Sequence, residues 1–149
     1  MANNIQYIRG DLMDYIDKNY YIAHQCNCIT NSASGLAKII FDKIPEANIY
    51  NDGTIREPGK VIIRKNIINM LAQYNAGGPN KYNTAIQREM LFKNCLKEII
   101  KIFPQGCNIA FPAYIGCGLA GGNWKNYNQM LINFSQENKK FNILIVEKK

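Results

Sequence analysis

Residues 111–124, which read F-P-A-Y-I-G-C-G-L-A-G-G-N-W, contain four glycines within the seven positions 116–122. An apolar segment leads into this stretch, and apolar residues with helical spacing begin at Trp124. A strand that ends in a glycine-rich turn before a helix exposes backbone N–H groups to an anion. Glycine suits such a turn because it has no Cβ to hold a phosphate away. The stretch therefore predicts a nucleotide or phosphate ligand.

Around this stretch, strand-like and helix-like segments alternate along the chain. Strands are predicted at 5–9, 20–26, 107–111 and 141–146, with an antiparallel hairpin formed by 60–64 and 67–72. Helices are predicted at 35–44, 84–103 and 124–134, with a short helical turn at 14–18. This alternation predicts an α/β protein: a three-layer α/β/α sandwich with a mixed, mostly parallel central sheet.

The apolar positions within the predicted helices indicate which face is buried. In the segment 84–103 they are Ile86, Met90, Leu91, Cys95, Ile99 and Ile102. We interpret them as the core-facing side of a long amphipathic helix.

Length and composition limit the class of protein. A chain of 149 residues predicts one domain, spanning 1–149. No apolar run approaches the roughly 20 residues that cross a bilayer, and the start of the chain does not resemble a signal peptide. Five cysteines form no C-x-x-C pair and only one histidine is present, so no metal site is indicated. We expect a soluble, cytoplasmic monomer with reduced cysteines and neither metal nor cofactor.

The chain carries a net charge of +7. Basic proteins often bind nucleic acids, but here the lysines are spread out, with no run longer than two. The charge indicates a general attraction for anionic ligands. We expect a small-molecule ligand and neither a nucleic-acid nor a membrane partner.

Three loops follow predicted strands, at the edge of the sheet where ligands bind in folds of this type. In the first, Asp11 is suited either to accepting a hydrogen bond from an adenine amino group or to capping a turn. In the second, Asn27 is suited either to holding a ribose hydroxyl or to closing an Asx turn. Backbone N–H groups at Gly35, Leu36 and Ala37 begin a helix and are suited to a diphosphate. The third loop is the glycine-rich stretch.

His24, the only histidine, lies at the end of an apolar strand. One interpretation is a hydrogen-bonded core residue. The other is a general base, or a group that positions a water molecule. The choice depends on the register of the strand, because a shift of one residue turns the side chain to the other face.

Taken together, these segments resemble the macrodomain family, which binds ADP-ribose, over almost the whole chain. The resemblance rests on G-D-L at 10–12, on H-Q-C-N at 24–27 where many members carry N-A-A-N, and on I-G-C-G-L-A-G-G-N-W at 115–124. Gly35 follows Asn27 by eight positions, as does the last glycine of the family's G-G-G-[VI]-A segment. The resemblance implies that Asp11 contacts adenine and that Asn27 holds the distal ribose.

The A-H-x-C-N and G-C-G-L-A-G-G-x-W patterns are most similar to the branch that includes ADP-ribose 1″-phosphate phosphatases. This resemblance implies conversion of ADP-ribose 1″-phosphate to ADP-ribose and phosphate, with His24 and Asn27 as catalytic residues. The implied ligand-binding residues are Asp11, Leu12, Asn27, Gly35, Leu36, Ala37, Ile115, Gly116, Cys117, Gly118, Leu119, Ala120, Gly121, Gly122 and Asn123.

Two departures from the family leave alternatives open. Enzymes of this branch that remove ADP-ribose from acidic side chains use a lysine and an aspartate, but 70–74 reads M-L-A-Q-Y and Ala120 replaces the aspartate. A mechanism through a lysine adduct is therefore not expected. Asn123 replaces the aspartate that commonly precedes the tryptophan. The alternatives are a non-catalytic module that binds ADP-ribose or an ADP-ribosylated protein, and a hydrolase of acylated or protein-linked ADP-ribose.

Overall fold

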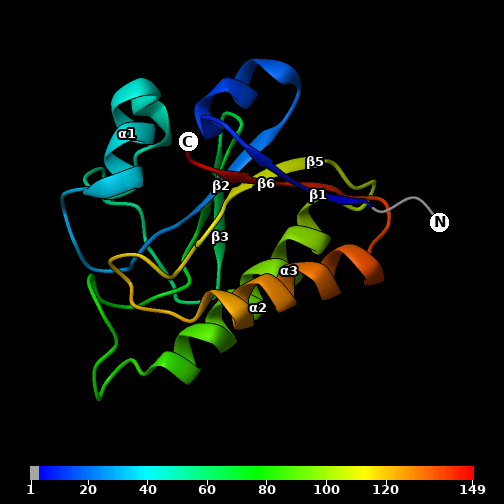
Figure 1. The fold of residues 1–149 in the computed structure, drawn as a ribbon. Coiled ribbons are helices and arrows are strands. Elements are labelled where there is room, and N and C mark those ends of the chain that lie inside the picture. Colours follow the sequence, from blue (N-terminus) through cyan, green and yellow to red (C-terminus); the bar gives the residue numbers. More distant parts are fainter. Residues whose placement is uncertain (1–3) are drawn as a thin grey trace.

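A computed structural model describes residues 4–149, which form a six-stranded mixed sheet in the order β1-β6-β5-β2-β4-β3 (Figure 1). The strands are β1 (Ile5–Arg9), β2 (Tyr21–Gln25), β3 (Val61–Arg64), β4 (Ile67–Met70), β5 (Asn108–Pro112) and β6 (Asn142–Glu147). Only β3 and β4 pair antiparallel, and every other neighbouring pair is parallel. The predicted mixed, mostly parallel sheet is confirmed.

Helices cover both faces of this sheet (Figure 1). On one face lie α1 (Gly35–Lys43) and the 3₁₀ helices η1 (Leu12–Lys18) and η2 (Pro45–Ala47). On the other face lie α2 (Ala85–Ile102) and α3 (Trp124–Glu137). Each face has its own apolar core, so the predicted three-layer α/β/α architecture is also confirmed.

Helix α2 differs from the sequence prediction in which of its faces is buried. A capping box starts the helix, with the Thr84 hydroxyl accepting from the Gln87 backbone N–H and the Gln87 side chain accepting in return. The buried residues of α2 are Arg88, Phe92, Cys95, Leu96 and Ile99. Cys95 and Ile99 are buried as predicted, whereas Ile86, Met90 and Ile102, also expected in the core, are exposed. The helix is rotated relative to the prediction because Arg88 occupies a core-facing position.

The parallel strands place their carboxyl ends at one edge of the sheet, and three loops meet there. These loops follow β2, β4 and β5 and cover residues 26–34, 71–83 and 113–123. This edge is where an open α/β sheet binds its ligand. Within residues 4–149, no helix is both long enough and apolar enough to cross a membrane.

Candidate functional site

A cavity of about 680 Å³ lies at this edge of the sheet. Its wall includes the end of β2, the start of α1, and the loops that follow β4 and β5. The predicted site residues that line it are His24, Asn27, Gly35, Leu36, Ala37, Ile115, Gly116, Cys117, Gly118, Leu119 and Ala120. The cavity therefore brings together two of the three predicted loops and the start of α1.

The glycine-rich loop offers backbone N–H groups on one side of the cavity. Internal turns fold the loop, with the Cys117 N–H donating to the Tyr114 carbonyl and the Gly122 N–H to the Gly116 carbonyl, both at 2.9 Å. Gly116 has φ +77°, and a Cβ there would lie 2.7 Å from Cε2 of Tyr127. The N–H groups of residues 116 and 118–120 have no partner within the described chain. Such a row of unpaired donors binds anions.

The start of α1 supplies a second set of donors. Ser34 is the N-cap residue but its side chain makes no capping hydrogen bond, and the first helical bond runs from the Lys38 N–H. The N–H groups of residues 35–37 therefore lack partners among the described residues, as expected for an uncapped helix start. Leu119 Cδ1 lies 3.8 Å from the position a Cβ on Gly35 would take, so the glycine-rich loop reaches across to α1. The positive end of the helix dipole adds to the attraction for an anion.

Asn27 closes an Asx turn, one of its two predicted roles, and its side chain still has a free N–H donor. Its Oδ1 accepts from the Ile29 N–H at 3.1 Å and from the Thr30 N–H and hydroxyl at 3.0 Å each, which is an Asx-type turn. Its Nδ2 has a single contact, 3.4 Å from the Tyr50 hydroxyl. The amide is thus held in place by its oxygen, while its nitrogen can donate to a ligand in the cavity.

Tyr50 lines the cavity beside Asn27, and Arg56 supports Asn27 from outside the lining; neither was predicted from the sequence. The Tyr50 hydroxyl accepts from the Asn27 backbone N–H at 3.0 Å, and burial raises the pKa of this phenol. The Arg56 guanidinium donates to the Asn27 carbonyl at 3.2 Å and lies 4.9 Å from the centre of the Tyr50 ring. Both residues come from the segment between α1 and β3, which carries no recognisable motif.

His24 lies in the wall of the cavity and is only 1% exposed. Its Nε2 lies 2.6 Å from Oδ1 of Asn69. Asn69 Nδ2 donates to the Ala47 and Ile62 carbonyls, so Oδ1 must face the imidazole and Nε2 carries the proton. Burial lowers the pKa of His24 to about 4, although the Asn69 bond opposes the shift. The imidazole is therefore neutral at pH 7, with Nδ1 as its acceptor.

The wall of the cavity also contains a chain of amides, formed by Gln25 and Gln73. Gln73 Nε2 donates to the Asn75 carbonyl at 2.9 Å, and Gln25 Nε2 donates to Gln73 Oε1 at 2.6 Å. Gln25 Oε1 is buried without a partner in the described structure. Gln73 belongs to the segment where the family resemblance led us to look for a lysine, and a neutral amide lines the cavity instead.

Five predicted site residues do not line the cavity: Asp11, Leu12, Gly121, Gly122 and Asn123. Asp11 is exposed and caps η1, with Oδ1 accepting from the Met13 N–H at 3.0 Å. Leu12 packs into the α1-side core. Asn123 caps α3 through the Lys125 N–H at 3.0 Å. Within residues 4–149, no group of three or more His, Cys, Asp or Glu side chains could hold a metal ion.

Several solved structures with a similar fold are macrodomains. The macrodomain of Mycobacterium tuberculosis DarG superposes with a TM-score of 0.76 at 20% identity, covering 97% of this chain and 98% of that one. The Oceanobacillus iheyensis macrodomain with ADP superposes at 0.60 and 19%, covering 97% and 83%. A Bacteroides thetaiotaomicron protein of unknown function reaches 0.73 and 22%, covering 99% of each chain. The chain has the macrodomain fold.

Sequence comparison gives one further relationship. No family model matches the chain. An uncharacterized 17.5 kDa protein from the tk-vs intergenic region of Enterobacteria phage T4 is 30% identical over an alignment of 156 residues, which covers 96% of each protein. The chain belongs to the same family as this phage protein.

Proposed function

We propose that the protein binds ADP-ribose in this cavity and hydrolyses ADP-ribose 1″-phosphate to ADP-ribose and phosphate. The observation that carries the binding proposal is the pair of donor sets that line one cavity, residues 35–37 and the glycine-rich loop, each with unpaired backbone N–H groups. Between them they suit a diphosphate, whose charge the dipole of α1 also favours. A volume of about 680 Å³ lies within the range of cavities that hold small ligands.

The rest of ADP-ribose is assigned to side chains at the same edge of the sheet. Nδ2 of Asn27 would donate to a hydroxyl of the distal ribose. Asp11, whose Oδ1 caps η1, would accept from the adenine amino group through Oδ2, which has no partner within residues 4–149. Asp11 lies outside the cavity wall, so the adenine would extend beyond it.

The phosphatase activity is supported by the groups around Asn27. His24 is neutral at pH 7, so Nδ1 can accept a hydrogen bond from the attacking water; with a pKa of about 4 the imidazole is a weak base, and its main role would be to orient this water. The water oxygen would bond to phosphorus as the bond from phosphorus to the 1″ oxygen breaks, and the proton that the water loses would pass to the 1″ oxygen, which leaves as a hydroxyl of ADP-ribose. Arg56 does not line the cavity, but it has no carboxylate partner in the described structure, and its charge behind the Asn27 carbonyl would favour the phosphate at longer range.

A non-catalytic binding module is the second candidate, and it too has a supporting observation. His24 is buried, and Asn123 caps α3, where many family members carry an aspartate. A module of this kind would keep every contact to the diphosphate and ribose but release no phosphate.

The experiment combines calorimetry with ADP-ribose and phosphate release from ADP-ribose 1″-phosphate. The variants are Asn27→Ala and His24→Gln, with Asn133→Ala, on the exposed side of α3, as the control. Turnover that both variants lose and the control keeps would support the phosphatase. Binding without turnover would favour the binding module, and the same samples would then be tested on protein-linked and acylated ADP-ribose. A parent protein that neither binds nor turns over these compounds would contradict the proposal.

A further inference from the structure

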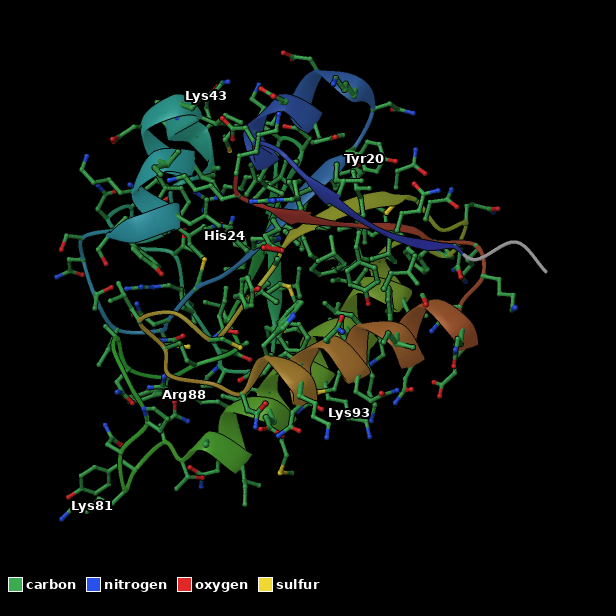
Figure 2. All side chains as sticks on the ribbon, viewed as in Figure 1. Tyr20, His24, Lys43, Lys81, Arg88 and Lys93 are labelled. Atoms are coloured by element: carbon green, nitrogen blue, oxygen red, sulfur yellow. The ribbon has the colours of Figure 1, made fainter. Side chains whose placement is uncertain are left out.

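Arg88 is a buried charge that the proposed function does not yet use. It is 1% exposed, and it is the one charged side chain among the buried residues of the described chain. Arg88 is labelled in Figure 2, and all five of its N–H donors have partners. Nε donates to Asn83 Oδ1 at 2.9 Å, Nη1 to the Gly77 and Ala120 carbonyls at 2.6 and 3.1 Å, and Nη2 to the Asn75 and Gly78 carbonyls at 3.2 and 3.0 Å.

These bonds connect two walls of the cavity. Gly77 lies in the loop that follows β4, and Ala120 lies in the glycine-rich loop. Both residues line the cavity. One guanidinium group therefore fixes the position of the predicted diphosphate-binding loop relative to the wall beside it.

Every partner of Arg88 is neutral. None of the ion pairs within residues 4–149 includes it, and the neighbouring Glu89 carboxylate instead accepts from Asn126 Nδ2 at 3.0 Å. Taking a charge out of water without a counter-ion is unfavourable, and an apolar side chain would avoid that cost. The charge is also poorly screened in this position, so it acts on groups inside the cavity.

We propose that Arg88 is a positioning residue that also sets the ligand preference of the site: it joins the two loops, and its unneutralised charge favours a diphosphate over an uncharged ligand. This inference rests on the proposed function, because it takes the ligand to be an adenosine diphosphate derivative. It adds that the preference for the anion comes partly from a side chain behind the loop and not only from the backbone N–H groups.

The decisive variant is Asn83→Asp. Asn83 Oδ1 accepts from Arg88 Nε and from the Tyr74 N–H, both at 2.9 Å, and a carboxylate of the same shape keeps both bonds. It also places a negative charge against the guanidinium, so the geometry is retained while the charge is neutralised. We expect the affinity for ADP, measured by calorimetry, to fall about ten-fold, and that for adenosine, followed by NMR titration, to change by less than about two-fold. Asn133→Asp, with the same change in net charge on exposed α3, should leave both affinities unchanged.

Two substitutions of Arg88 itself separate the effect of its charge from the effect of the hydrogen bonds that join the two loops. Arg88→Lys keeps the charge but loses most of the bonds, and Arg88→Met loses both, with circular dichroism giving the folded fraction of each. Arg64→Met is the control for removal of an arginine, because Arg64 bonds to Asn48, Asp52 and Thr54 and does not line the cavity. We expect the ratio of ADP to adenosine affinity to fall in Arg88→Met and to be largely kept in Arg88→Lys.

The outcomes distinguish the inference from the proposed function. If the parent protein binds neither ADP nor ADP-ribose, the proposed function fails and the inference fails with it. If the parent binds ADP and Asn83→Asp binds it equally well, the inference alone is overturned. It is also overturned if ADP and adenosine lose affinity by the same factor in Asn83→Asp, because Arg88 would then only hold the loops together.

Discussion

The burial of His24 makes stability depend on pH in a predictable direction. Its pKa is about 4 in the folded protein and returns to about 6.5 in the unfolded chain. Between these values the unfolded chain binds more protons than the folded one, so the free energy of unfolding falls as the pH decreases from 6.5 towards 4. This stabilisation is fully present above pH 6.5. At pH 5 the two pKa values give a loss of about 2 kcal/mol relative to pH 8.

The measurement is urea unfolding at pH 8 and pH 5, on the parent and on His24→Gln. Glutamine can still donate to Asn69 Oδ1 but does not titrate, and the carboxylates titrate equally in both proteins. We expect the parent to lose about 2 kcal/mol more than the variant. The NMR signal of the imidazole, the only one in the chain, should shift with a midpoint near pH 4.

Two results would refute this reasoning. A midpoint near the ordinary value of about 6.5 would mean that the imidazole is solvated in the folded protein. Equal loss of stability in the parent and His24→Gln would mean that burial does not lower the pKa of the His24 imidazole, because His24 would then contribute nothing to the pH dependence of the free energy of unfolding. The same pKa governs the proposed catalysis, since a base that is protonated only near pH 4 gives an acid limb of kcat/KM there and not near neutrality.

Other perturbations test the loop, the start of α2 and the thiols. Gly118→Ala should leave stability unchanged, because a Cβ there meets no protein atom, yet it should weaken ADP-ribose binding about ten-fold or more. Gly122→Ala should lower the free energy of unfolding by about 2 kcal/mol, because its Cβ would collide with the Gly116 carbonyl. Thr84→Ala should lower the free energy of unfolding by about 1 kcal/mol in urea titrations through loss of the capping box. Burial raises the pKa of Cys26 to about 12 and that of Cys95 above its ordinary range, so native protein at pH 8 should protect both thiols from a thiol reagent, as mass spectrometry would show.

The sheet and its covering helices were predictable because their signals are local. Apolar runs, helical spacing and the short gap between the two predicted hairpin strands each depend on neighbours in the sequence, and they predict the correct order of elements. The buried face of α2 was predicted only in part, with Cys95 and Ile99 correct and Ile86, Met90 and Ile102 wrong, because Arg88 interrupts its apolar stripe. Phe92, Cys95, Leu96 and Ile99 continue that stripe, and Arg88 lies one turn before Phe92, so the correct face was present in the sequence with a charge at its first position.

The candidate site was predictable where a loop follows a strand, and not where contacts come from distant segments. The glycine-rich loop and the start of α1 meet at the cavity because parallel strands align their carboxyl ends. Tyr50 and Arg56 reach Asn27 from more than twenty positions along the chain, with no motif to mark them. Arg88 was missed for a related reason: four of its five hydrogen-bond acceptors are backbone carbonyls, which any sequence provides.

Hydrogen bonds to the carbonyl groups of the glycine-rich loop explain why this loop would favour an anion over a cation. In this loop the carbonyls of Tyr114, Gly116 and Gly118 accept from later N–H groups of the loop, and that of Ala120 accepts from Arg88. The loop's acceptors are thus largely occupied within the protein, while several of its donors are not. A segment with free N–H groups and bonded carbonyls presents partial positive charge to the cavity. Arg88 therefore acts on the loop twice, because it occupies an acceptor and adds a positive charge behind the same surface.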